Sequence, residues 1–199
     1  MSVVHFITHP DVLIDPAMPI PDWPLSPRGR ARMEAALTAP WVSAITTIHS
    51  STERKAIDGA EILAAHLGLG FATHPDLGEN DRSATGYLPR EEFEATADRF
   101  FAHPGESIRG WERALDAQAR IVAALTRILS LPRPPGDVAI VAHGGVGALL
   151  LCHLLAEPIS RTRDQPPTAA GGFRFAFDAA SGQVRHGWER IDTNCENDY

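Results

Sequence analysis

Short apolar runs alternate with stretches of helical hydrophobic spacing along almost the whole chain. The runs at 3–8, 45–49 and 138–142 are rich in β-branched residues and are typical of strands that are buried on both faces. A weaker run lies at 71–74. Helical spacing, bounded by capping residues, prolines or glycines, predicts helices over 27–40, 53–67, 90–102, 111–129 and 147–155. Ser50, Ser51 and Thr52 offer caps for the second of these helices. The inner face of the fourth is expected to consist of Trp111, Leu115, Gln118, Val122, Leu125 and Leu129.

The last part of the chain predicts a β-hairpin. Residues 173–178 and 183–191 alternate apolar and polar positions around the turn sequence Ala179-Ala-Ser-Gly182. Strands that alternate with helices predict a mostly parallel sheet covered on both faces, to which the hairpin adds an antiparallel edge. We therefore expect an α/β fold, a three-layer α/β/α sandwich, as a single domain over residues 1–199 with a polar tail at about 192–199.

Two long segments show no regular pattern. The segment 10–24 holds five prolines, and the segment 75–89 is polar and irregular. Prolines exclude a continuous helix from the first segment, and long polar loops often carry function. We expect these loops to determine specificity, together with Trp23, Tyr87 and Arg90 if these three side chains line the mouth of a site.

Composition and charge exclude several function classes. The formal charge at pH 7 is −7 and acidic and basic residues are interspersed, whereas nucleic-acid-binding proteins carry clustered Lys and Arg. No apolar stretch reaches the about 20 residues that cross a bilayer, and no secretory signal precedes the first strand. The two cysteines, Cys152 and Cys195, form no disulfide framework. We expect a cytoplasmic protein without a nucleic-acid or membrane partner.

A histidine follows each of two predicted buried strands. His9 ends the run at 3–8, and His143 ends the run at 138–142 and is followed by two glycines. The carboxyl ends of parallel strands form the edge where open α/β sheets bind ligands, and a helix N-terminus favours an anion. We expect one phosphate-handling site that contains both imidazoles. A capping or core role for His143, and a His9 tucked under the proline-rich loop, are the structural alternatives.

A metal site is not expected from the histidine spacing. His5 and His9 share one face of the first strand, but the strand rise separates them by about 13 Å, too far to bind one ion directly. The remaining histidines are scattered along the chain. We expect neither a metal ion nor a cofactor.

Several motifs occur in the order and spacing of one known family. They are Thr8-His9-Pro10, Leu25-Ser-Pro-Arg-Gly29, Ser50-Ser-Thr-Glu-Arg-Lys-Ala-Ile-Asp-Gly-Ala60, Gly110-Trp-Glu112 with Arg120, and Val138-Ala-Ile-Val-Ala-His-Gly-Gly145. Through this combination the chain, from residue 3 to about 178, resembles the histidine phosphatase superfamily, which includes the cofactor-dependent phosphoglycerate mutases. The last motif matches most closely, and the order of the motifs is more specific than any one of them.

The resemblance implies catalytic roles for three residues. His9 would be the nucleophile that accepts the phosphoryl group, because a neutral imidazole presents a lone pair near pH 7 without a separate base. His143 and the amide of Gly144 would donate hydrogen bonds to the phosphoryl oxygens. Glu79 would protonate the leaving oxygen, with Asp81 as the second candidate. A solvated loop carboxylate is the structural alternative for both acids.

The resemblance also places polar groups beside the phosphate. Ser26 and Asp15 fall where family members carry such groups, although Ser26 equally fits a helix N-cap. Glu112 and Arg120 lie two helical turns apart, which favours a structural ion pair over a contact with substrate.

Two arginines of the family pattern are missing. Thr8 stands at the first position and Lys55 at the second, so a hydroxyl and a point charge replace two guanidinium groups. Pro10 replaces the family's glycine and has no N–H. Each lost charged hydrogen bond costs on the order of 1.5–3 kcal/mol of transition-state binding. Arg82 is the preferred source of a replacement guanidinium group. Arg54 is less suitable, because adjacent helical positions point roughly 100° apart, so Arg54 and Lys55 would not both face the pocket.

These features predict a phosphatase that hydrolyses small phosphomonoesters through a phosphohistidine on His9, with a weakened phosphate pocket. A mutase fits less well, because it must retain the phosphoryl group in a strongly basic pocket. The alternative is a non-catalytic relative that binds a phosphorylated ligand or partner, which Thr8-His9-Pro10 favours and the two histidines with Glu79 oppose. The natural substrate and the oligomeric state stay open.

Overall fold

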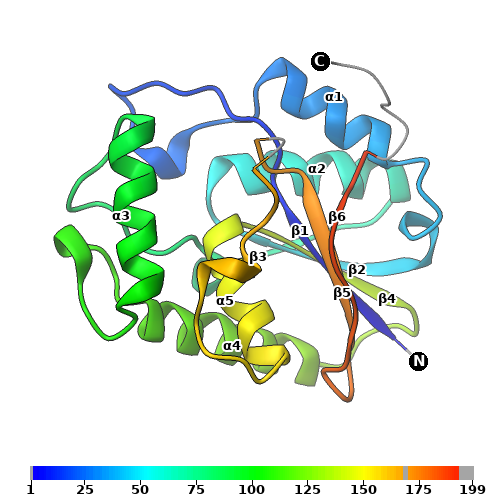
Figure 1. The fold of residues 1–199 in the computed structure, drawn as a ribbon. Coiled ribbons are helices and arrows are strands. Elements are labelled where there is room, and N and C mark those ends of the chain that lie inside the picture. Colours follow the sequence, from blue (N-terminus) through cyan, green and yellow to red (C-terminus); the bar gives the residue numbers. More distant parts are fainter. Residues whose placement is uncertain (1, 168–169, 193–199) are drawn as a thin grey trace.

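A computed structural model describes residues 2–167 and 170–192, and all its strands belong to one sheet. The strands are β1 (Val3–Thr8), β2 (Ile45–Ser51), β3 (Ala72–His74), β4 (Asp137–Ala142), β5 (Phe173–Asp178) and β6 (Val184–Arg190). They lie in the order β3-β2-β4-β1-β5-β6. The first four pair in parallel, and β5 pairs antiparallel with β1 and β6. The expected mostly parallel sheet with an antiparallel edge hairpin is confirmed (Figure 1).

Helices cover both faces of this sheet. Helices α1 (Pro27–Ala36) and α2 (Arg54–Leu67) pack on one face, and α4 (Ala114–Ser130) and α5 (Gly144–Leu154) pack on the other (Figure 1). Alternate residues of the central strands enter different cores: Phe6 and Ile140 contribute to the α4/α5 side, and Ile7 and Val141 to the α1/α2 side. Burial on both faces explains the continuous apolar runs. The three-layer sandwich is confirmed.

Helix α3 (Arg90–Ala102) has the bounds that its hydrophobic spacing predicts and stands to one side of the sheet in Figure 1. The start of α1 and the end of α2 also lie where the sequence predicts them. Ser26 Oγ accepts a hydrogen bond from the amide of Gly29 at 3.0 Å and so caps α1, and Gly68 ends α2 with a φ of 65°.

Several local expectations were wrong. The helix expected over 27–40 ends at Ala36, and the helix expected from residue 147 begins at Gly144. Strand β2 continues through Ser51, and Glu53 rather than a serine or threonine precedes α2, with no side-chain capping bond. The expected inner face of α4 included Leu115, which is 49% exposed, whereas the buried face consists of Ala114, Ala117, Ile121, Ala124, Leu125 and Ile128. Alanines form much of that face because α4 packs closely on α5, and a search for large apolar residues misses them.

Among the described helices, none has the length and apolar character needed to span a bilayer. Cys152 is a buried free thiol in α5, whereas Cys195 and nearly all of the expected polar tail lie outside the described residues.

The sheet register places three site residues side by side. Thr8 pairs with Ala142, and Ser50 pairs with Val141. The residues that follow, His9, Ser51 and His143, therefore emerge at one edge of the sheet.

Candidate active site

His9 lies directly after β1 and faces the second histidine. Its Nδ1 is 2.9 Å from the carbonyl oxygen of Pro10. A carbonyl oxygen only accepts, so Nδ1 carries a proton and Nε2 of the neutral ring keeps its lone pair. Burial, reinforced by the positive charge of Lys55, lowers the pKa of His9 to about 4. The ring centroids of His9 and His143 are 5.2 Å apart.

His143 is fully buried between β4 and α5. Its Nε2 lies 2.8 Å from Ser51 Oγ and 3.3 Å from Glu53 Oε1. Its Nδ1 has no hydrogen-bond partner within the described part of the chain. Burial lowers the pKa of His143 to about 4, although the Glu53 carboxylate opposes the shift. One nitrogen of His143 is therefore held by protein groups. The other is buried without a partner among the described residues, and His143 is not one of the residues that line the cleft next to His9.

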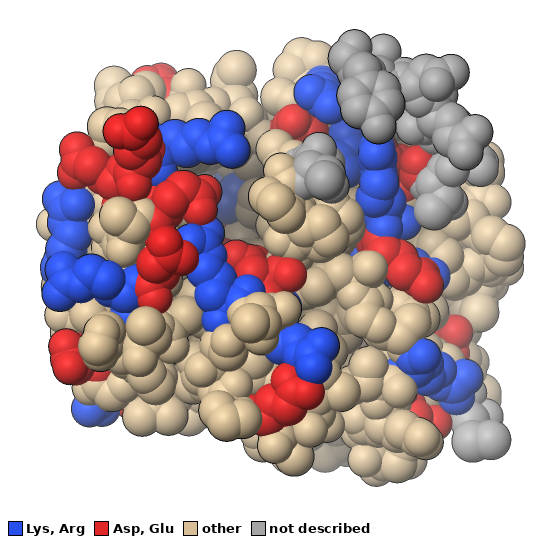
Figure 2. All heavy atoms as spheres, viewed as in Figure 1, with Lys and Arg blue, Asp and Glu red and all other residues tan. Residues whose placement is uncertain are grey.

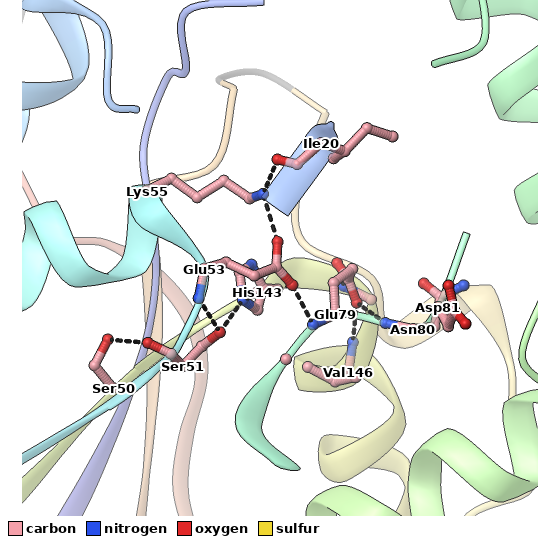
Figure 3. A network of polar contacts seen from close by, with 12 residues as sticks. Ile20, Ser50, Ser51, Glu53, Lys55, Glu79, Asn80, Asp81, His143 and Val146 are labelled. Carbon is pink, nitrogen blue, oxygen red and sulfur yellow. Dashed lines mark hydrogen bonds and ion pairs between the residues drawn. The ribbon is translucent and has the colours of Figure 1, made fainter. Parts of the chain in front are cut away.

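Glu53 was not anticipated from the sequence. Its carboxylate accepts hydrogen bonds from Lys55 Nζ and from the Glu79 amide, the latter at 2.8 Å, and it lies against His143 (Figure 3). These neighbours lower the pKa of Glu53 to about 2 despite its burial, with the His143 interaction the largest favourable cause. Lys55, the residue in place of the family arginine, also donates to the carbonyl of Ile20 at 2.8 Å. Its charge is thus neutralised within the protein.

Glu79 lies at the N-terminus of α5. Its carboxylate accepts from the amides of Gly145 and Val146 at 3.0 Å each, and from its neighbour Asn80 at 3.1 Å (Figure 3). A Cβ on Gly145 would lie 2.7 Å from Glu79 Oε1, and one on Gly144 would lie 2.7 Å from the Gln165 amide nitrogen. The two glycines are needed because these polar side chains approach the backbone closely.

Arg120 on α4 holds the segment that carries Glu79. Its guanidinium donates to the carbonyl oxygens of Asp76 and Gly78 at 2.9 Å each and of Glu79 at 3.2 Å. It also pairs with Glu112 at 2.8 Å. These contacts confirm the structural role expected for Glu112 and Arg120.

A cleft of about 920 Å³ opens above His9, Glu79 and Gly144. One wall is aromatic and comes from α3 and the segment before α4; it consists of Phe93, Phe100, Phe101 and Trp111. Both basic and acidic side chains surround the hollow in Figure 2. The cleft is large enough for a phosphoester with a sizeable leaving group.

Arg82 and Arg54 differ in their surroundings. The Arg82 guanidinium lines the cleft, 5.2 Å from the Phe93 ring and 5.7 Å from the Trp111 ring, and pairs with no carboxylate among the described residues. Arg54 instead pairs with Asp58 and Glu61 on α2. Of the two candidate replacements for the missing arginines, the structure brings Arg82 into the cleft.

The Thr8 side chain is buried beneath the site and does not face the cleft. It is 1% exposed, and its Oγ1 donates to Gln165 Oε1 at 2.9 Å and accepts from the Phe173 amide at 3.0 Å. The hydroxyl is therefore fully engaged with protein groups. Gln165, which sequence reasoning missed, lines the cleft against Gly144.

Three other candidates lie outside the residues that line the cleft. Ser26 acts as the N-cap of α1, and Asp15 is exposed and accepts from the Ala17 amide in a tight turn. Asp81 is exposed, and hydrogen bonds from Ser83 hold the pKa of its carboxyl below the usual value. An ionised, outward carboxylate is poorly suited to donate a proton.

Only one of the three residues expected at the mouth of the site lies there. Arg90 lines the cleft, whereas Trp23 and Tyr87 do not. Trp23 is buried and its Nε1 donates to the carbonyl of Asp15 at 2.9 Å, which fixes the proline-rich loop. The Tyr87 ring lies 6.0 Å from the Trp23 ring. Within residues 2–167 and 170–192, no three His, Cys, Asp or Glu side chains are grouped to hold a metal ion.

The fold and the site define a class of protein: a three-layer α/β sandwich with two facing histidines at the carboxyl ends of adjacent parallel strands. The profile of the histidine phosphatase superfamily (branch 1) matches residues 18–187. The chain belongs to this superfamily. The match begins after Thr8-His9-Pro10, the motif that departs from the family pattern.

Solved structures with the same fold cover nearly the whole chain. A mycobacterial glucosyl-3-phosphoglycerate phosphatase in complex with inorganic phosphate is 20% identical, with a TM-score of 0.74 over 96% of this chain and 99% of that one. Bacillus stearothermophilus YhfR is 22% identical, with a TM-score of 0.74 over 94% and 95%. A putative alpha-ribazole-5'-P phosphatase from Escherichia coli is 17% identical, with a TM-score of 0.68 over 95% and 97%. No curated protein sequence matches the chain significantly.

Proposed function

We propose that the protein is a phosphatase that hydrolyses small phosphomonoesters through a phosphohistidine on His9. The observation that carries this proposal is the facing pair of His9 and His143, each with one ring nitrogen held by the protein and the other directed to no protein partner within the described chain. The cleft beside this pair holds Glu79, the glycine-rich start of α5 and the guanidinium of Arg82.

In the first step, His9 Nε2 attacks the phosphorus atom, the bond to the ester oxygen breaks, and a proton from Glu79 neutralises the departing oxygen. In the second step, Glu79 takes a proton from water as the water oxygen attacks phosphohistidine. Inorganic phosphate leaves and neutral His9 is restored.

Charge in the site favours slow turnover. Lys55 is neutralised by Glu53, and Thr8 supplies only a hydroxyl that is already engaged. Arg82 is the cation in the cleft that we assign to the phosphoryl group. The phosphate complex of the mycobacterial relative supports an anion site in this fold, and its name supports a phosphomonoester with a bulky leaving group.

The test is turnover of p-nitrophenyl phosphate by the wild-type protein and by His9→Ala. We expect the variant to lose at least about a thousandfold in kcat/KM, because the nucleophile is removed. His103→Ala, at an exposed histidine that pairs with Glu106, is the matched control and should keep wild-type activity. Equal rates for His9→Ala and wild type would contradict the proposal.

A second candidate function is binding of a phosphorylated ligand without turnover. The pairing of Lys55 with Glu53 favours it, because this pair leaves less positive charge for transition-state stabilisation. Thermal protection by inorganic phosphate, with no release of p-nitrophenol from a correctly folded sample, would select this function.

A further inference from the structure

The Glu53 carboxylate lies behind His143, on the side of the ring that carries Nε2. It is held there by Lys55 Nζ and by the amide of Glu79, and its Oε1 is 3.3 Å from His143 Nε2 (Figure 3). Only 11% of the Glu53 side chain is exposed. A carboxylate so enclosed interacts with its neighbours more strongly than a surface carboxylate does.

This contact favours a proton on Nε2 of His143. The Ser51 hydroxyl can either donate to Nε2 or accept from it, whereas the carboxylate of Glu53 can only accept. Placing a proton on Nε2 converts a repulsive contact with the Glu53 carboxylate into an electrostatic attraction. In a neutral ring the proton on Nε2 leaves Nδ1 with a lone pair.

An oxyanion bound next to Nδ1 changes which protonation state of the His143 ring is favoured. The phosphoryl oxygens and a lone pair repel each other, so the ring binds the anion well only when Nδ1 also carries a proton. The charges that face His143 are the carboxylates of Glu53 and Glu79, which favour this second proton, and Lys55 and His9, which oppose it. Without an anion, burial keeps the ring neutral, with its pKa lowered to about 4.

We propose that Glu53 is a positioning residue that couples anion binding in this site to the uptake of one proton by His143. The proton comes from solvent, and the resulting imidazolium donates from Nε2 to Glu53 and from Nδ1 to the bound oxyanion. The imidazolium thus supplies a positive charge where Thr8 and Lys55 leave two guanidinium groups missing. This inference rests on the proposed phosphate site but not on turnover.

The experiment measures proton uptake during binding of tungstate, a tetrahedral dianion that does not itself titrate near neutral pH. Calorimetric titrations in two buffers of different ionisation enthalpy give the number of protons taken up per tungstate. We expect about one proton for the wild-type protein at neutral pH, and an affinity that falls about tenfold per pH unit as the pH rises. In Glu53→Gln, which keeps an acceptor for the Glu79 amide, uptake should fall to a small fraction and the affinity should become nearly independent of pH.

Two controls locate the effect. Glu189→Gln removes another carboxylate that lies 3.5 Å from a histidine, His186, on the distant strand β6, and it should leave proton uptake unchanged. His9→Asn should also retain the uptake, because the proton goes to His143. The ¹⁵N shifts of the His143 ring in the wild-type protein provide a readout that needs no variant, and they should change to those of an imidazolium when tungstate binds.

Undiminished uptake in Glu53→Gln, loss of uptake in His9→Asn, a neutral His143 ring in the tungstate complex, or no tungstate binding at millimolar concentration would each overturn this inference. Loss of phosphatase activity alone does not bear on it. A protein that takes up the proton without hydrolysing any ester contradicts only the proposed function, and a protein that hydrolyses esters with unchanged uptake in Glu53→Gln contradicts only the inference.

Discussion

Gly145 couples the backbone of α5 to the carboxylate of Glu79. An added Cβ would lie 2.7 Å from Glu79 Oε1, so Gly145→Ala must displace the carboxylate and lengthen the amide hydrogen bond that orients it. We expect kcat for an aryl phosphate to fall about tenfold to a hundredfold, since a misplaced acid loses much of the contribution of general acid catalysis. Gly187→Ala, where an added Cβ meets no atom within 4 Å, is the control and should keep full activity. Unchanged turnover in Gly145→Ala would argue against Glu79 as the acid.

Arg82 is the cation in the cleft that we assign to the phosphoryl group. Its guanidinium lines the cleft without a carboxylate partner among the described residues, so Arg82→Ala should remove one charged hydrogen bond to the phosphoryl group. We expect kcat/KM to fall about tenfold to a hundredfold, which corresponds to about 1.5–3 kcal/mol. Arg113→Ala removes an exposed arginine that pairs with Asp116, and it should have no effect. Equal values for wild type and Arg82→Ala would remove Arg82 from the site.

Sequence predicted the paired histidines because a strand end followed by a helix start is a local pattern. It missed Glu53, although an acidic residue between Ser51 and Lys55 was a visible signal, because a carboxylate runs against the positive charge expected of a phosphate site. It gave no signal for Gln165, whose place against Gly144 depends on how a loop distant in sequence returns over the sheet edge.

Among the helices, α4 holds the segment that contains Glu79 in place through the side chain of Arg120. Arg120 donates to three carbonyl oxygens of that segment, and its replacement leaves acceptors without a charged donor. Arg120→Gln should lower the free energy of unfolding by about 1–3 kcal/mol and reduce kcat as the segment loses its position. Denaturant titration and steady-state kinetics measure the two effects. Arg127→Gln, a change on the same helix that breaks an exposed ion pair with Asp76, should change each much less.

The bounds of β1 and α3 followed from sequence because periodicity and flanking breakers define both elements locally. The inner face of α4 did not follow, since its small residues become core only through close packing on α5. The aromatic wall of the cleft also escaped prediction, because the place of α3 beside the cleft depends on residues distant in sequence, such as Arg161, which binds Glu94 and Asp98 of α3.

For the whole molecule, buried neutral imidazoles predict a loss of stability in mild acid. The pKa of His143 falls from 6.5 to about 4 in the folded protein, chiefly through burial. Above pH 6.5 the ring is neutral in both the folded and the unfolded protein, so it does not change the free energy of unfolding. Below that pH the unfolded chain binds the proton first, and the free energy of unfolding declines as the pH falls towards 4. At about pH 5 the loss from one such ring is about 2 kcal/mol. His9 and His49 carry similar shifts.

Urea unfolding at several pH values measures this decline, and His143→Asn should flatten it because the variant has one fewer group to protonate in the unfolded chain. A variant curve as steep as that of the wild type would show that His143 is not buried in its neutral form. The fold class and the sheet edge at which His9 and His143 meet are properties of the whole molecule that sequence did predict, because strand order and helix alternation constrain both.

The central claim is that His9 accepts the phosphoryl group, and the most direct measurement is the mass of the intact protein after rapid mixing with an aryl phosphate and an alkaline quench, which preserves phosphohistidine. We predict a population heavier by one phosphoryl group in the wild-type protein, with the modification mapped to His9, and none in His9→Asn. Turnover by a wild-type protein that never carries the added mass, or an equal modification in His9→Asn, would contradict it.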